Sequence, residues 1–168
     1  CVTTDIPLLL DADALHALAE SGPGLTSRRS ASTVLTPHPG EMARLTGASI
    51  SAVQRNRIAS ARDLAATLNL HVVLKGARTV IAHPDGSVHV NPTGNPGMAA
   101  GGMGDVLTGA IAGLITQGVR PDLAARAAVY LHGAAGDRLA RERGPWGFLA
   151  GEVMNALPGE IADALGSS

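Results

Sequence analysis

Short apolar runs alternate with helical patterns along the first part of the chain. Runs of the strand type occupy residues 8–10 and 33–35, and a helical pattern covers residues 12–20 between them. Further helices are predicted from Gly40, from Ser51 and over residues 59–68. A buried-strand type of run follows at residues 71–74. This strand–helix rhythm is typical of a parallel sheet whose crossovers are helices.

The middle of the chain predicts a hairpin. Residues 79–82 and 87–90 are rich in β-branched side chains and flank Asp85-Gly86, where glycine tolerates the positive φ of a tight turn. The remaining helical patterns cover residues 105–117, ended by Gly118, residues 121–141, opened by Pro121, and residues 151–165. Gly109 and Gly113 inside these patterns are most simply explained by close helix packing. The pattern therefore predicts an α/β fold, with a mostly parallel sheet, helices on both faces and one antiparallel hairpin.

Composition narrows the class of protein. With 168 residues and 45% hydrophobic content, the chain can enclose one substantial core, and its 2% aromatic content means a core of Leu, Val, Ile and Ala. A net charge of −1 gives no basic face for nucleic acid, and no apolar run has membrane-spanning length. The single cysteine, Cys1, cannot form an internal disulfide, which fits a cytoplasmic protein. Because the segment from Cys1 ends in the apolar residues 6–10, as if a strand were already under way, and has no initiator Met, we expect the chain to be the later part of a larger domain.

Ligands of such sheets gather beyond the carboxyl ends of the strands, so the residues after each apolar run are candidates. Four stretches qualify, namely residues 11–13, 36–41, 75–76 and 91–105. The last holds five glycines and two prolines directly before a helix. Its backbone N–H groups and the helix dipole favour an anion, most obviously a phosphate, and Asp105 is then placed to act as a general base.

Other interpretations of this loop are weaker. A plain helix cap is the simplest, but the length and glycine density of the loop favour phosphate binding. A dinucleotide fingerprint fails because Leu107 stands where the third glycine is needed, and no Lys-Ser/Thr pair follows as a P-loop requires. Neither a Rossmann nor a Walker-A site is therefore expected.

Residues 91–105 resemble the nucleotide-loop signature of the NAD(P)H-hydrate dehydratases, a family with the ribokinase-like fold. Three further stretches agree with that family in order along the chain: Asp11-Ala12-Asp13-Ala14-Leu15, then residues 36–41 with His38-Pro39-Gly40-Glu41, then Lys75-Gly76-Ala77-Arg78-Thr79-Val80. The resemblance runs from near residue 8 to about residue 160. It implies one domain over residues 1–168, a three-layer α/β/α sandwich whose N-terminal part is missing.

The resemblance also implies an activity. The family dehydrates hydrated NADH and NADPH (NADHX and NADPHX), by phosphorylating the ring hydroxyl with ADP or ATP and then eliminating the phosphate, and Mg²⁺ accompanies the nucleotide. On this mapping Asp105 takes the hydroxyl proton and contacts the substrate together with His38 and Asn95. The residues that line the adenine nucleotide are Lys75, Gly76, Ala77, Arg78, Thr79, Gly102 and Gly104.

Several alternatives stay open at this point. Asp11 and Asp13 either orient a hydrated Mg²⁺ or, in the case of Asp11, cap the following helix. Lys75 is either a snorkelling strand-end lysine or a cation near phosphates. The sequence departs from the family at Met103, where a small hydroxyl residue is usual, and at His16, where Asn is usual.

The same motifs also fit other molecules. A vitamin-precursor type of kinase with this fold would use the same Gly-x-Gly-Asp loop, although the stretch around His38 argues against it. A third possible function is that of a non-catalytic nucleotide-binding fragment. A homo-oligomer is expected, because the missing front of the domain leaves a sheet edge and an apolar face to be covered.

Overall fold

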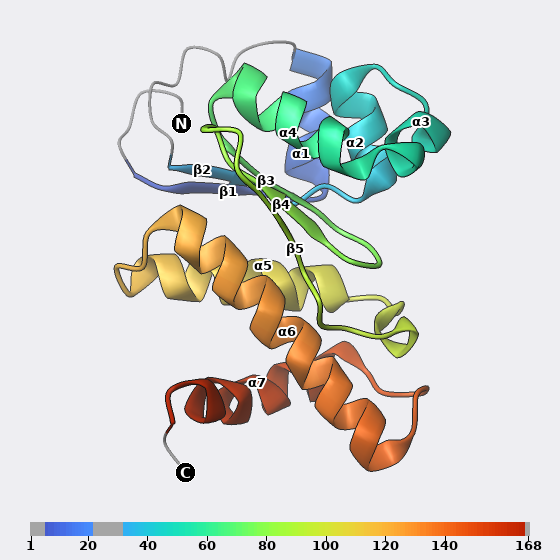
Figure 1. Ribbon diagram of the computed structural model, residues 1–168, viewed down its shortest axis with the longest axis vertical. Helices are drawn as coiled ribbons and strands as arrows, with labels where there is room; N and C mark the ends of the chain where they lie inside the picture. Colours follow the sequence, from blue (N-terminus) through green and yellow to red (C-terminus); the bar gives the residue numbers. More distant parts are fainter. Residues whose placement is uncertain (1–5, 22–31, 167–168) are drawn as a thin grey trace.

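The computed structural model describes residues 6–21 and 32–166 (Figure 1). Its strands are β1 (Leu8–Leu10), β2 (Thr33–Leu35), β3 (His71–Leu74), β4 (Val80–Ala82) and β5 (Val88–Val90). Its helices are α1 (Asp13–Ser21), α2 (Pro39–Thr46), α3 (Ile50–Arg55), α4 (Arg57–Leu68), the 3-10 turn η1 (Pro96–Met98), α5 (Met103–Thr116), α6 (Pro121–Arg143) and α7 (Ala150–Ala164).

The strands form one five-stranded sheet in the order β1-β2-β3-β4-β5. β1, β2 and β3 run parallel, with Leu9 paired to Val34 and Leu35 paired to Val72. β4 is antiparallel to both β3 and β5, and the β4–β5 turn has Gly86 at φ 84°. The fold class predicted from the sequence is confirmed, and the structure adds that β3 and β4 are also joined as an antiparallel pair.

Helices cover both faces of the sheet (Figure 1). Because side chains alternate along a strand, Val72 and Leu74 of β3 pack toward α1–α4, while Val73 points to the opposite face and packs on α5 and α6. A third cluster joins α5, α6 and α7, where Met103 contacts Phe148 and Val153. The result is three layers, with α7 packed on the outer side of α5 and α6 (Figure 1). Within the described ranges no helix combines the length and apolarity needed to cross a bilayer.

Predicted helix ends differ from the observed ones by two residues or fewer. α5 begins at Met103 rather than Asp105, because Gly102 takes the left-handed conformation, φ 82°, and turns the chain into the helix. Gly118 ends the helix as expected, with φ 87° and its N–H bonded to the Ile115 carbonyl. Gly102 thus sets where α5 begins, and Gly118 sets where it ends.

The packing role predicted for Gly109 and Gly113 is wrong. A Cβ added at either residue would meet nothing within 4 Å, so no neighbouring helix requires glycine there. The close approach lies on α6 instead, where a Cβ at Gly133 would lie 2.8 Å from the Thr93 carbonyl carbon and one at Gly136 would lie 2.7 Å from Met98 Cγ. The glycines of α6 thus seat the long loop that precedes α5.

Candidate active site

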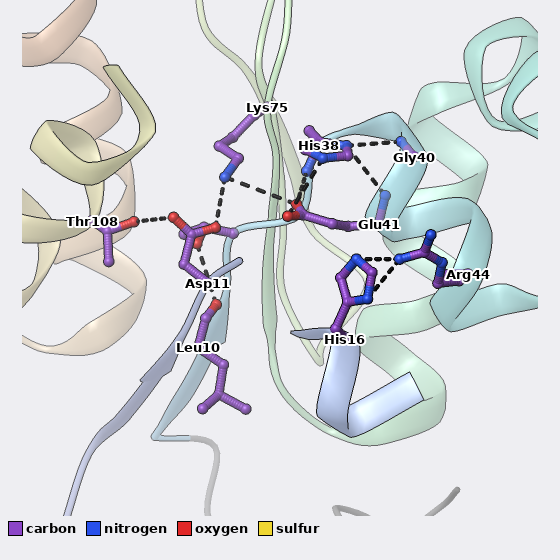
Figure 2. A network of polar contacts seen from close by, with 10 residues as sticks. Leu10, Asp11, His16, His38, Gly40, Glu41, Arg44, Lys75 and Thr108 are labelled. Carbon is purple, nitrogen blue, oxygen red and sulfur yellow. Dashed lines mark hydrogen bonds and ion pairs between the residues drawn. The ribbon is translucent and has the colours of Figure 1, made fainter. Parts of the chain in front are cut away.

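The carboxyl ends of the parallel strands converge on one ion pair (Figure 2). Asp11 directly follows β1 and Lys75 directly follows β3, and Lys75 Nζ lies 2.6 Å from Asp11 Oδ1. Lys75 Nζ also lies 3.9 Å from Oε2 of Glu41, which stands in the first turn of α2. Asp11 and Lys75 come from strand-end stretches that the sequence singled out, and the structure brings them together with Glu41 at this edge of the sheet.

The Asp11 carboxylate has partners on both oxygens. Its second oxygen, Oδ2, accepts a hydrogen bond from the Thr108 hydroxyl of α5 at 2.8 Å (Figure 2). Burial raises the pKa of Asp11, but the hydrogen bonds from Lys75 and Thr108 and the lysine charge outweigh it, so the pKa is lowered. Asp11 is therefore held as a carboxylate, and its side chain does not cap α1.

His38 and Glu41 cap the start of α2. His38 Nδ1 accepts from the Gly40 N–H at 2.9 Å and from the Glu41 N–H at 3.2 Å, and Glu41 Oε2 accepts from the His38 N–H at 2.7 Å. The His38 side chain stays 56% exposed, while Glu41 is 7% exposed. Nδ1 is used by the cap and Nε2 lies 3.5 Å from Glu41 Oε1, so a ligand would meet the exposed imidazole beside that carboxylate.

The N-terminus of α5 abuts the ion pair. A Cβ at Gly104 would lie 3.4 Å from Lys75 Nζ and 3.8 Å from Asp11 Oδ2, which is ordinary van der Waals contact, so the first turn of α5 lies directly beside the ion pair. The first bond across the start of the helix runs from the Val106 N–H to the Gly102 carbonyl. The N–H groups of Met103, Gly104 and Asp105 precede it and, like the first amides of any helix, have no partner within the helix. Asp105 stands in this first turn with an exposed side chain.

The segment after β3 is fixed by α4 and by the hairpin. Arg57 of α4 donates from Nη2 to the carbonyls of Leu74, at 3.0 Å, and Lys75, at 3.3 Å. The Thr79 hydroxyl donates to the Gly76 carbonyl at 3.0 Å, and Gly76 has φ 138°. Ala77 and Arg78 are exposed, and Arg78 Nη1 donates to the Pro92 carbonyl at 3.3 Å. The predicted nucleotide-lining segment is thus an ordered, exposed turn beside the glycine-rich loop.

Asn95 is held from outside the loop. Its Nδ2 donates to Asp137 Oδ1 of α6 at 2.9 Å, and its Oδ1 accepts from the Gly97 N–H at 3.0 Å. Asp13 lies in the first turn of α1 with an exposed side chain and is the predicted site residue least connected to the cluster. Over residues 6–21 and 32–166, no group of three or more His, Cys, Asp or Glu side chains is arranged to hold a metal ion.

The two departures from the family pattern have ordinary structural roles. Met103 is 6% exposed and packs into the cluster with Phe148, so its side chain points away from the loop surface. His16 of α1 hydrogen-bonds Arg44 of α2 (Figure 2). Two hollows of about 600 and 720 Å³ lie elsewhere, and none of the residues discussed above as site residues lines either of them. In the described part of the chain the site is an open edge, with Gly102 and Asp105 exposed.

Three contributors were missed from the sequence. Thr108 follows Gly104 by four residues, so helical spacing places both on the face of α5 that meets Asp11. Glu41 stood out in the sequence only as the end of the His38-Pro39-Gly40-Glu41 stretch, yet the His-x-x-Glu spacing is that of a capping box. Arg57 gave no local signal, because its partners are strand-end carbonyls 17 and 18 residues away.

Comparison with known proteins decides the family. The family model described as NAD(P)H-hydrate dehydratase matches residues 1–159. The chain belongs to this family. It is 54% identical, over 153 residues, to the bifunctional NAD(P)H-hydrate repair enzyme of Moorella thermoacetica, covering 91% of this chain and 29% of that protein.

Solved structures of relatives share the fold. The ADP/ATP-dependent NAD(P)H-hydrate dehydratase of Bacillus subtilis, co-crystallised with ATP and Mg²⁺, superposes with a TM-score of 0.87 and 41% identity. That match covers 96% of this chain and 56% of the B. subtilis chain. A ribokinase-like superfamily protein of Enterococcus faecalis matches with a TM-score of 0.78, 34% identity and coverage of 93% and 52% of the two chains. The ribokinase-like class is confirmed, and this dehydratase-family chain spans about half the length of those two solved relatives.

Proposed function

We propose that this chain carries the phosphoryl-transfer edge of an NAD(P)H-hydrate dehydratase, which dehydrates NADHX and NADPHX at the expense of ADP or ATP. The observation that carries the proposal is that the first turn of α5, at Gly104, lies next to the Lys75–Asp11 pair. It brings the free amides of a helix N-terminus, one cation and the exposed Asp105 to the same edge of the sheet. The family match and the name of the B. subtilis relative support the reaction.

Each group then has a defined task. The amides of Gly102 and Gly104 and the α5 dipole stabilise the negative charge that develops on the transferred phosphoryl group. Asp105, whose side chain is exposed, accepts the proton of the ring hydroxyl as the hydroxyl oxygen attacks phosphorus. The nucleotide leaves one phosphoryl group shorter, as AMP from ADP or as ADP from ATP. The phosphorylated ring then loses inorganic phosphate together with a proton from the neighbouring ring carbon, and the double bond of the dihydronicotinamide forms. His38 and Asn95 contact the hydrated nicotinamide nucleotide, and residues 75–79 line the adenine nucleotide.

Magnesium fits this site only as a companion of the nucleotide. Mg²⁺ prefers oxygen ligands and usually keeps several waters, so one or two carboxylates and the phosphates suffice. Asp11 Oδ1 already accepts from Lys75 and Oδ2 from Thr108, so contact with the ion through water would leave both hydrogen bonds in place. The assignment of Asp11 and Asp13 to a hydrated Mg²⁺ stays a prediction. When bound, the ion would neutralise phosphate charge.

The test is turnover of a defined substrate. Purified protein with NADHX, Mg²⁺ and either ADP or ATP should restore the absorbance of the dihydronicotinamide ring and release inorganic phosphate. A phosphorylated alcohol that accumulates as final product, with vitamin precursors as substrates, would instead indicate a kinase of this fold. Nucleotide binding without any turnover would indicate a non-catalytic nucleotide-binding part.

The assembly and location of the protein belong to the same proposal. We infer a single domain that forms a homo-oligomer, works in the cytoplasm and binds neither nucleic acid nor membrane. Met154 and Ile161 of α7, and Leu165 directly after it, are large apolar residues with exposed side chains, which agrees with an oligomer. Sedimentation of the purified protein at several concentrations would measure its association state.

A further inference from the structure

We propose that Asp137 of α6 is a positioning residue, which sets the conformation of the loop that leads to Asp105 and fixes the orientation of the Asn95 amide. The inference rests on the proposed function, because it concerns how that site is held. Asp137 touches no predicted nucleotide-lining residue and acts through the loop. The sequence patterns did not single it out.

Both oxygens of Asp137 are used by the loop. Oδ2 accepts from the Gly94 N–H at 2.9 Å, and Oδ1 accepts from Asn95 Nδ2 at 2.9 Å. Gly94 has φ 96°, a conformation that glycine adopts without strain. Hydrogen bonds to a carboxylate are stronger than neutral ones, so this pair holds the turn more firmly than backbone contacts alone.

The rest of the loop lies directly on the same helix. The Thr93 hydroxyl donates to the Tyr130 carbonyl at 2.9 Å, one turn of α6 before the contact with Gly133. Gly133 and Gly136 leave no room for a Cβ beneath Thr93 and Met98. The loop from Thr93 to Met98 is thus laid along one face of α6, with Asp137 as its charged anchor.

Asp137 also decides which way the Asn95 amide points. An amide has two N–H donors and two acceptor lone pairs, and its two ends are nearly the same shape. The carboxylate accepts only, so it selects the Nδ2 end, while the Gly97 N–H selects the Oδ1 end. One donor and one lone pair of Asn95 then remain for a ligand, in a fixed orientation. Without the carboxylate the amide loses the partner that orients it.

Substitution by the isosteric amide gives a sharp test. In Asp137→Asn, one end of the new side chain is a donor and faces either the Gly94 N–H or Asn95 Nδ2, so one hydrogen bond is lost. Misplacement of reacting groups by about 1 Å can cost roughly 100-fold. We expect kcat/KM for NADHX to fall roughly 10- to 100-fold, with faster amide exchange at Gly94 and Gly97 and unchanged exchange in α7.

A reciprocal swap separates positioning from simple stability. In the double variant Asn95→Asp/Asp137→Asn, residue 95 again accepts from Gly97 and from residue 137, which again accepts from Gly94. We expect slow exchange at Gly94 and Gly97 and most of kcat to return, while KM for NADHX stays high because the outward N–H of Asn95 is gone. Asp122→Asn, which removes another α6 carboxylate whose partner is Arg120, is the matched control and should leave activity unchanged.

The outcomes distinguish this inference from the proposed function. An active Asp137→Asn protein with wild-type kcat/KM would overturn the inference and leave the proposed function standing. A swap that does not slow the exchange of Gly94 and Gly97 would also overturn it. If the wild-type protein shows no turnover, the proposed function fails, and exchange in Asp137→Asn alone decides whether Asp137 anchors the loop.

Discussion

At the scale of single residues, the Lys75–Asp11 pair decides the electrostatics of the site. The Lys75 side chain is 19% exposed and the Asp11 side chain 12% exposed, so neither charge is well solvated. A partly buried ion pair gains little net stability, but removing one partner leaves the other charge uncompensated. Lys75 is the only lysine of the sequence, so one substitution removes every lysine charge.

The variant Lys75→Met should therefore destabilise the protein by on the order of 3 kcal/mol at neutral pH, measured by urea unfolding. The pKa of Asp11 lies below its ordinary value of 3.8 in the folded protein, so its stabilising effect is present above that pH and is lost as the pH falls through the folded value. The difference in free energy of unfolding between wild type and Lys75→Met should become smaller below about pH 4. Arg62→Met, which breaks the exposed Arg62–Asp63 pair, is the control and should lower the free energy of unfolding only slightly. If both variants lost the same free energy of unfolding, the partly buried Lys75–Asp11 pair would not have the electrostatic role described here.

At the scale of elements, α5 and α6 use glycine for different reasons. Gly109 and Gly113 of α5 face open space, whereas Gly133 of α6 lies against the backbone of Thr93. Helix interiors favour alanine over glycine unless a neighbour occupies the place of the methyl group. Replacing glycine by alanine should therefore change the free energy of unfolding in opposite directions on the two helices.

Gly109→Ala should raise the free energy of unfolding by about 1 kcal/mol, because a helix gains from alanine where nothing is displaced. Gly133→Ala should lower it by roughly 1–3 kcal/mol, because the methyl group crowds Thr93. Thermal unfolding of both variants beside the wild type measures the contrast. A destabilised Gly109→Ala protein would show that the packing interpretation of α5 was correct after all.

The contact between α6 and α5 also predicts a pH dependence. Burial lowers the pKa of His132 to about 4, although a hydrogen bond to the Met103 backbone opposes this. The unfolded chain binds a proton near the ordinary value of 6.5, so stability is full above that pH and falls as the pH drops toward 4, by about 3 kcal/mol for this group. His132→Leu should make the fall of the free energy of unfolding between these pH values less steep, while the part due to His83, whose pKa burial also lowers to about 4, remains. If the free energy of unfolding of the variant fell with pH as steeply as that of the wild type, His132 would not contribute to this pH dependence.

At the scale of the whole molecule, local patterns predicted the elements, and tertiary contacts supplied the site. β3 was predicted to the residue because His71–Leu74 is a short apolar run ahead of Lys75-Gly76. The Asp11–Thr108 hydrogen bond joins residues 97 positions apart, and the Lys75–Asp11 bond joins residues 64 apart. No periodicity encodes such pairs. The rule that ligands gather at strand carboxyl ends located Asp11 and Lys75, but it could not show that they bind each other.

For the same reason the role of α6 could not be predicted from the sequence. Its sequence predicted a helix from Pro121, but not that Gly133 and Asp137 lie beneath the loop, because these contacts depend on how α6 crosses the preceding segment. No sequence pattern predicted a contact between His71 and His83. They form a buried pair with 2.8 Å between their Nδ1 atoms, which is decided by the pairing of β3 with β4.

The central claim is that Asp105 works as a base beside a phosphate-holding helix start, and one comparison tests it most directly. Turnover of NADHX and affinity for the adenine nucleotide should be measured for wild type and Asp105→Asn. The account predicts that the variant loses the reaction while nucleotide affinity stays largely intact, since the amides and Lys75 remain. An Asp105→Asn protein that still dehydrates NADHX at the wild-type rate would contradict it.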